Sequence, residues 1–156
     1  MTVSTDAKER EYPLAKLTTT KTKKADPGRK LAIEAARIAA DSHSEDIVVL
    51  DLRGRSPVTD YYVIATGSSD RQMRSVADDI AAAGKKMDMR VWHIAGLESS
   101  AWILLDFVDV VVHLFDDAHR HYYDLELLWG DAPRVRWKRP VRKATTDTTE
   151  DAGEDE

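Results

Sequence analysis

The feature that most constrains the fold is a strand, an amphipathic helix and a second strand in direct succession in the middle of the chain. Tyr61–Thr66 is rich in aromatic and β-branched residues, as strands are. A helix over 69–87 follows, in which Ser69 and Gln72 fit a capping box and apolar residues recur at helical spacing. Arg90–Ala95 is the second strand. Such a unit within one sheet is nearly always right-handed and parallel, so these two strands are predicted to be parallel.

The remaining elements follow from the same kinds of pattern. Asp26 as a cap and Pro27 in the first turn start a first helix that ends near Ser42. The short apolar run Ile47–Leu50 is typical of a strand that is buried on both faces. Trp102–Leu105 and Val110–Phe115 form an antiparallel hairpin. A third helix, which carries the apolar residues Tyr122, Leu125, Leu128 and Trp129, runs from Asp116 to a stop at Gly130. The predicted fold class is α/β, a single domain with a mixed sheet of about five strands and flanking helices.

Charge divides the chain into three parts. Residues 31–133 hold nine basic and eighteen acidic side chains, a net charge of −9, and form the predicted domain. Residues 1–30 are a basic arm and residues 134–156 are a tail that is basic to 143 and then acidic; both are predicted to be disordered. An acidic domain repels the phosphates of nucleic acids and suits a basic protein partner.

Catalytic patterns in the sequence are incomplete. Gly67–Asp70 lies where a strand turns into a helix, which favours a helix cap and leaves a phosphate site as the weaker alternative, since no Walker or dinucleotide pattern is present. Nucleotidyl transfer needs paired carboxylates for metal ions. Asp78 and Asp79 diverge on a helix, whereas Asp106 and Asp109 flank a hairpin and could approach each other. A solvated turn is the favoured interpretation of that second pair.

Metal binding and membrane insertion are not predicted. His113, His119 and His121, with Asp116 and Asp117, are the densest group of metal-capable residues, but no two of these histidines have the i, i+4 spacing of helical ligands. The chain has no cysteine, which excludes disulfides and thiolate sites. It also has no apolar run long enough for a membrane span and no export signal, so a cytoplasmic location without cofactors is expected.

Aromatic residues cluster late in the domain and alternate with carboxylates. Core packing explains most of them, but the same composition is typical of an interface with aromatic anchors and an acidic rim. The residue pattern alone leaves both interpretations open. The group consists of Trp102, Phe107, Tyr122, Tyr123 and Trp129.

Several sequence blocks occur together in a fixed order between residues 31 and 133. They are Asp46–Asp51, Val58–Tyr61, Ala65–Gln72, Trp102–Asp106, Asp109–His113 and Tyr123–Pro133. In these blocks the chain resembles the ribosomal silencing factors, also called Iojap-related proteins. The resemblance implies a fold related to nucleotidyltransferases but without their catalytic carboxylates, and no enzymatic activity.

The resemblance also implies a partner. Members bind the large ribosomal subunit through ribosomal protein fourteen, block joining of the small subunit and repress translation when nutrients are scarce. A factor that acts in assembly of the large subunit would use the same face, and sequence does not separate the two roles. The residues implied for partner binding are Trp102, Asp106, Asp109, His113, Tyr123, Asp124 and Glu126.

Some features depart from the family or stay open. Val108 occupies a hairpin position where members usually have Gly, so the turn must be strained or of another type. The basic segment 134–143 either contacts ribosomal RNA or is a solvated linker. A divergent nucleotidyltransferase that uses Ser68, Asp106 and Asp109 is the alternative function from another class, and a homodimer is left open.

Overall fold

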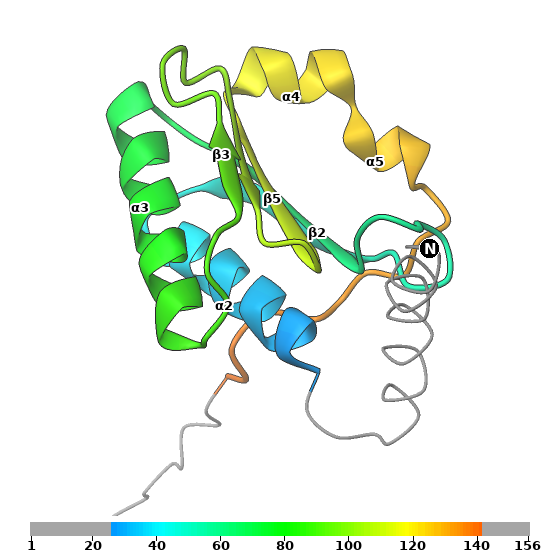
Figure 1. Ribbon diagram of the computed structural model, residues 1–156. Coiled ribbons are helices and arrows are strands. Elements are labelled where there is room, and N and C mark those ends of the chain that lie inside the picture. The colour runs from blue at the N-terminus through cyan, green and yellow to red at the C-terminus, as the bar shows by residue number, and fades with distance from the viewer. Residues whose placement is uncertain (1–25, 142–156) are drawn as a thin grey trace, which may run out of the picture.

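A five-stranded sheet is the centre of the fold, in a computed structural model that describes residues 26–141. Helices α2 and α3 cover one face, and the short helices α4 and α5 lie on the other side (Figure 1). The predicted fold class is therefore confirmed. The elements are α2 (Pro27–Asp41), β1 (Glu45–Asp51), β2 (Tyr61–Thr66), α3 (Asp70–Lys86), β3 (His93–Ala95), β4 (Trp102–Asp106), β5 (Val110–Phe115), α4 (Asp117–Tyr123) and α5 (Leu125–Leu128).

The strand order is β1-β2-β5-β4-β3. β2 and β5 are parallel neighbours, and the other three pairs are antiparallel. β2 and β3 point in the same direction, as predicted, but they are not paired, because the β4–β5 hairpin inserts between them. β3 is also shorter than the predicted Arg90–Ala95 strand and pairs only with β4.

The two long helices begin at the predicted caps. The Asp26 carboxylate accepts a hydrogen bond from the Arg29 amide at 3.0 Å, at the start of α2. At the start of α3, Ser69 Oγ accepts from the Gln72 amide at 3.1 Å and Gln72 Oε1 accepts from the Ser68 amide at 2.9 Å. Two amides of this turn are thus already bonded, which favours the cap over a phosphate site.

The free edge of β1 is covered by the chain that follows α5. The Asp51 amide donates to the Pro133 carbonyl and the Val135 amide donates to the Val49 carbonyl, both at 2.8 Å. Helix α2 begins at Pro27, at the cap predicted at 26–28, so its first turn lies within the predicted arm 1–30. At the other end, Val135 and Trp137 of the predicted tail pack on the domain. An edge strand needs partners for its backbone groups, and the basic stretch supplies them. The disorder predicted for 1–25 and 142–156 lies outside the described residues.

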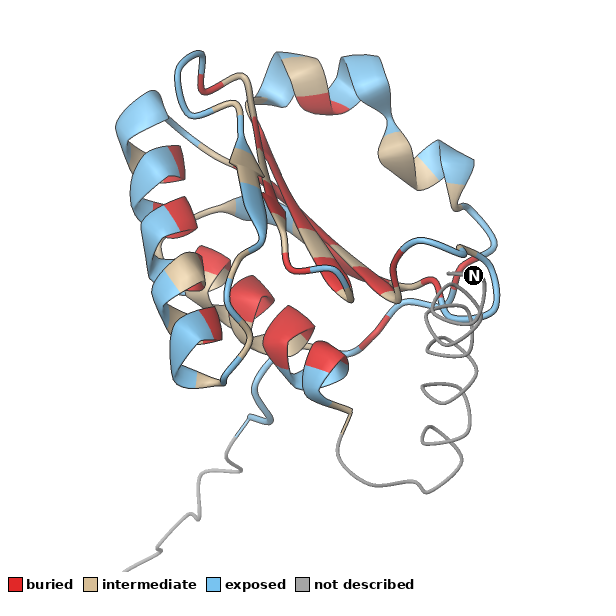
Figure 2. Cartoon of the chain, in the orientation of Figure 1, coloured by how far each residue is buried: buried red, intermediate tan, exposed pale blue. Residues whose placement is uncertain are grey.

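The core lies mainly between the sheet and the two long helices. Figure 2 shows buried residues along the strands and on the inward sides of α2 and α3, whose outward sides are exposed. A second, smaller cluster lies on the opposite sheet face, where Leu125 and Trp129 pack against buried strand residues. Alternate residues of each central strand thus contribute to opposite faces.

The prediction of one continuous third helix is wrong. The chain breaks at Asp124, which has a left-handed φ of 42°, and α4 and α5 are separate short helices. The break lets Leu125 and Trp129 return to the sheet, whereas a continuous helix would carry them past it. Tyr122 and Leu128, expected on the packed side, are 80% and 71% exposed.

Candidate partner-binding surface

The sheet face opposite α2 and α3 is the candidate surface, because α4 and α5 are short and lie toward one border of it (Figure 1). On β4, Ile103 and Leu105 are buried in the core with the long helices. The alternate residues Trp102, Leu104 and Asp106 are half-buried on the other face. This face therefore presents a row of side chains that the long helices do not cover.

A run of aromatic rings in contact with one another, which we call the aromatic ribbon, crosses this face. The Trp102 ring lies 4.6 Å from that of Tyr123 and 4.9 Å from that of Phe115, between ring centres. The Tyr62 and His113 rings are 4.5 Å apart. Phe115 and His113 are buried, whereas Tyr123 is 42% exposed, so the ribbon belongs partly to the core and partly to the surface. Its members are Tyr62, Trp102, His113, Phe115, Tyr123 and Trp129.

His113 fixes the position of Trp102. The indole Nε1 of Trp102 donates to His113 Nδ1 at 3.1 Å, so the neutral imidazole carries its proton on Nε2. Burial lowers the pKa of His113 to about 3, which keeps the ring neutral at physiological pH. Nε2 is buried and has no hydrogen-bond partner among the described residues. His113 is therefore a supporting residue beneath the surface.

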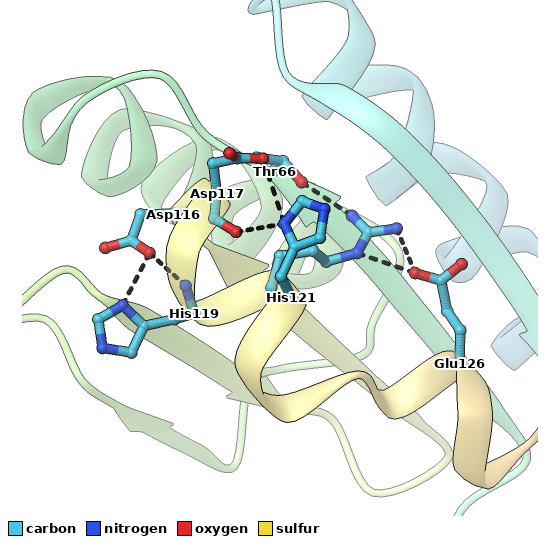
Figure 3. Close-up of polar contacts among 7 residues, drawn as sticks. Thr66, Asp116, Asp117, His119, His121 and Glu126 are labelled. Atoms are coloured by element: carbon cyan, nitrogen blue, oxygen red, sulfur yellow. Dashed lines mark hydrogen bonds and ion pairs between the residues drawn. The ribbon is translucent and has the colours of Figure 1, made fainter.

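An arginine holds α4 and α5 against the sheet (Figure 3). Nε and Nη2 of buried Arg120 donate to Glu126 Oε1 at 2.9 and 2.7 Å, and Nη1 donates to Thr66 Oγ1 at 3.0 Å. Glu126, an implied partner-binding residue, is thus engaged within the domain. Arg120 could not be recognised from local sequence patterns, since its partners lie 6 and 54 residues away.

The remaining implied residues are distributed unequally. Asp106 lies on the open face, about 13 Å along β4 from Trp102, and its Oδ1 accepts from the Val108 amide at 2.7 Å. Asp124 is exposed at the α4–α5 break. Asp109 lies beside α2, its Cβ 3.4 Å from where a Cβ on Gly28 would stand. Asp106 and Asp109 therefore do not share a face on which to hold a metal ion.

The two histidines of α4 have their hydrogen-bond partners within the same helix and its cap. His119 Nδ1 lies 2.7 Å from the Asp116 carboxylate, and His121 Nδ1 lies 2.8 Å from the Asp117 carbonyl oxygen. Figure 3 shows these two rings on different sides of α4. The hydrogen bond to the Asp117 backbone is the main cause that raises the pKa of His121. Within residues 26–141, no three such side chains are grouped as metal ligands.

An exposed apolar group lies beside the ribbon, and two of its three members, Leu127 and Leu128, were not among the interface candidates from the sequence. Tyr122, Leu127 and Leu128 are 80%, 78% and 71% exposed, and we call them the apolar rim. The ring of Tyr122 lies 5.0 Å from that of Tyr123, which joins the rim to the ribbon. The sequence prediction placed Tyr122 and Leu128 among the apolar residues of one continuous helix, and the break at Asp124 ends that helix. No helix of the described part is long and apolar enough to cross a membrane.

Known proteins match the chain in sequence and in fold. The ribosomal silencing factor of Bacillus subtilis is 42% identical over 99 residues, which cover 64% of this chain and 84% of that protein. The chloroplast Iojap protein of Arabidopsis thaliana is 33% identical over 104 residues, covering 67% of this chain and 43% of that protein. A solved structure from Chromobacterium violaceum has a TM-score of 0.59 and 35% identity, covering 73% and 92% of the two chains.

A second solved structure, from Bacillus halodurans, has a TM-score of 0.57 at 33% identity and covers 69% of this chain and 94% of that one. The family model described as ribosomal silencing factor during starvation matches residues 25–156. This match includes the whole sheet and both helical layers, and it agrees with the sequence blocks noted above. The chain belongs to the ribosomal silencing factor family.

Proposed function

We propose that the chain binds the large ribosomal subunit through ribosomal protein fourteen and blocks joining of the small subunit. Membership of the family supports a role at the ribosome. The observation that carries the proposal is the continuity of the aromatic ribbon with the apolar rim. Half-buried Trp102 contacts partly exposed Tyr123, which contacts the exposed ring of Tyr122, and these rings form an apolar surface of the kind that anchors protein interfaces.

Charge supports a basic partner. Asp106 and Asp124 lie on or beside the open face, and residues 31–133 carry a net charge of −9. Opposite charges steer two proteins together, and like charges repel wrong partners. A basic ribosomal protein satisfies this requirement, whereas free RNA does not.

The proposed mechanism is steric and needs no chemistry. An interface of about 1,200–2,000 Å² is sufficient for specific binding, and a few aromatic anchors carry most of its energy. The helical layer of α2 and α3, on the other side of the sheet, would then project from the large subunit into the space that the small subunit occupies. The protein would act in the cytoplasm, where ribosomal subunits join.

The test is co-sedimentation of purified variants with large ribosomal subunits. Tyr123→Ala and Leu128→Ala remove exposed side chains, so binding should fall at least tenfold while the circular dichroism spectrum is unchanged. Trp92→Ala is the control, because Trp92 is 75% exposed and its ring contacts that of His93 but no ring of the ribbon. Full binding by both Tyr123→Ala and Leu128→Ala would rule out this face. Gradients from growing and starved cells would show whether mature or immature particles are bound.

The basic stretch 134–143 remains a candidate for contact with ribosomal RNA. Arg134 and Arg139 already form ion pairs with Glu126 and Asp41, at 3.7 and 2.9 Å. Arg136 and Lys138 are exposed. If this stretch binds RNA, replacing these two exposed side chains by Ala should reduce the salt dependence of binding to the large subunit.

A further inference from the structure

A groove on the helical side of the sheet has no role in the proposed function. It lies between α2 and the last turn of α3, and the apolar side chains of Ile33, Ala83 and Met87 line it. Lys30, Arg37 and Lys86 also line it. The groove is therefore an apolar channel with cationic walls, on the face opposite the aromatic ribbon.

The cations of this groove are not neutralised within the described part of the chain. Lys30 and Lys86 form no ion pair with any residue of 26–141, and Arg37 Nε donates to a backbone oxygen, that of Trp137. Glu34 is the one carboxylate among the lining residues. Three cations against one carboxylate in a domain that is otherwise acidic select an anionic occupant.

The chain itself leads to this groove. After covering β1, it passes along α2, where Trp137 packs on the core and Arg139 pairs with Asp41 at 2.9 Å. Figure 1 shows this stretch crossing under α2 toward the lower end of α3. The described part stops at Val141, beside the helical layer, and fifteen more residues follow.

We propose that the acidic segment Thr145–Glu156 docks in the groove between α2 and α3. The segment contains six carboxylates and no cation, which complements the walls of the groove. Asp147 follows Val141 by six residues, about 20 Å of extended chain, a reach greater than the roughly 10 Å along α2 between Glu34 and Asp41. Tethering also gives the segment a high effective concentration, so individually weak ion pairs are enough.

Docking of this kind would neutralise the helical face. With the segment in place, the groove is closed to phosphates and to other acidic proteins, and the aromatic ribbon is the main surface left for a partner. This inference does not depend on the ribosomal role, since the groove and the ribbon lie on opposite sides of the sheet. It can therefore be tested on the isolated full chain.

Paramagnetic relaxation in NMR spectra tests the contact directly. The chain has no cysteine, so Ala152→Cys provides a single site for a nitroxide label in the acidic segment. We expect the amide signals of Ile33, Ala83 and Met87 to lose most of their intensity at low salt, and those of β4 and α4 to keep theirs. At about 1 M salt, where the Debye length is about 3 Å, the signals should return.

Charge variants distinguish a specific contact in the groove from attraction of the segment by the overall charge of the domain. Lys30→Glu combined with Lys86→Glu should abolish the intensity loss. Arg71→Glu combined with Arg74→Glu is the matched control, with the same change in net charge about 20 Å away on α3, and should leave the loss in place. Glu34→Gln should make the contact persist to higher salt.

Three outcomes would overturn the proposal. The first is intensity loss that is spread evenly over the domain or centred on the aromatic ribbon. The second is loss that survives Lys30→Glu with Lys86→Glu. The third is loss seen in an isotope-labelled chain without nitroxide when it is mixed with a nitroxide-labelled chain, which would assign the contact to a second copy.

Discussion

Val108 carries backbone strain at the tip of the β4–β5 hairpin. Its φ is 73°, a region that β-branched residues avoid. The Asp109 amide donates to the Phe107 carbonyl at 2.9 Å across it, as in the rare γ-turn with positive φ. Val108→Gly should therefore raise the free energy of unfolding by about 1 kcal/mol, measured by urea denaturation. Val58→Gly, at an exposed position without positive φ, should give no gain. A loss of stability in Val108→Gly would refute the strain.

His113 makes stability depend on pH. Burial lowers the pKa of its imidazole from 6.5 to about 3, so between these values the unfolded chain binds a proton that the folded chain does not. The free energy of unfolding should therefore fall as pH drops below 6.5, by up to about 1.4 kcal/mol per pH unit. His113→Gln keeps an acceptor for Trp102 and should flatten this slope between pH 6 and 4.5 in urea denaturation. Exposed His93→Gln should retain the slope, and equal slopes in the two variants would contradict the assignment.

At the scale of elements, the Arg120–Glu126 pair holds α5 in place. Glu126→Gln leaves the guanidinium of Arg120, which is only 9% exposed, without its counter-charge and should lower the free energy of unfolding by about 2 kcal/mol. Hydrogen exchange should accelerate at the amides of residues 124–129 more than in β2. Glu98→Gln, at an exposed turn, is the control. Unchanged exchange at 124–129 would show that α5 is held by other contacts.

Elements with local signals could be predicted, and elements set by distant contacts could not. The caps at Asp26 and Ser69 and the β4–β5 hairpin depend on residues a few positions apart, and the sequence located all of them. The order of the strands and the break at Asp124 depend on contacts across the fold. The spacing of Tyr122, Leu125 and Leu128 fits a helix equally well with or without the break.

At the scale of the whole molecule, the sheet separates two surfaces of different chemistry. One face carries the aromatic ribbon and apolar rim with carboxylates nearby, and the other carries a groove with cationic walls. Composition predicted an acidic domain with aromatic anchors, but not which residues share a face. Asp109 and Glu126 illustrate what composition does not predict. Asp109 lies beside α2, and the Glu126 carboxylate accepts hydrogen bonds from Arg120. Of the seven residues implied by the family resemblance, Trp102, Asp106, Tyr123 and Asp124 remain as candidates for direct contact.

This separation leads to a prediction for association with the large subunit. Carboxylates near a docking face steer a basic partner more than carboxylates farther away than the Debye length, about 8 Å at physiological salt. Asp106→Asn combined with Asp124→Asn should therefore lower the association rate several-fold at low salt. Both substitutions are conservative, because Asn can accept from the Val108 amide and tolerates the left-handed φ at 124.

The matched control is Asp78→Asn combined with Asp79→Asn, which makes the same change in net charge on the exposed side of α3, behind the sheet. Its association rate, measured on immobilised large subunits with a surface biosensor, should stay close to that of the parent chain. The difference in association rate between the two variants should shrink as salt is added, because salt screens the electrostatic attraction. The dissociation rate is set mainly by the apolar contacts and should change little. Equal rates for the two variants at low salt would mean that net charge, and not its placement on the open face, governs the encounter.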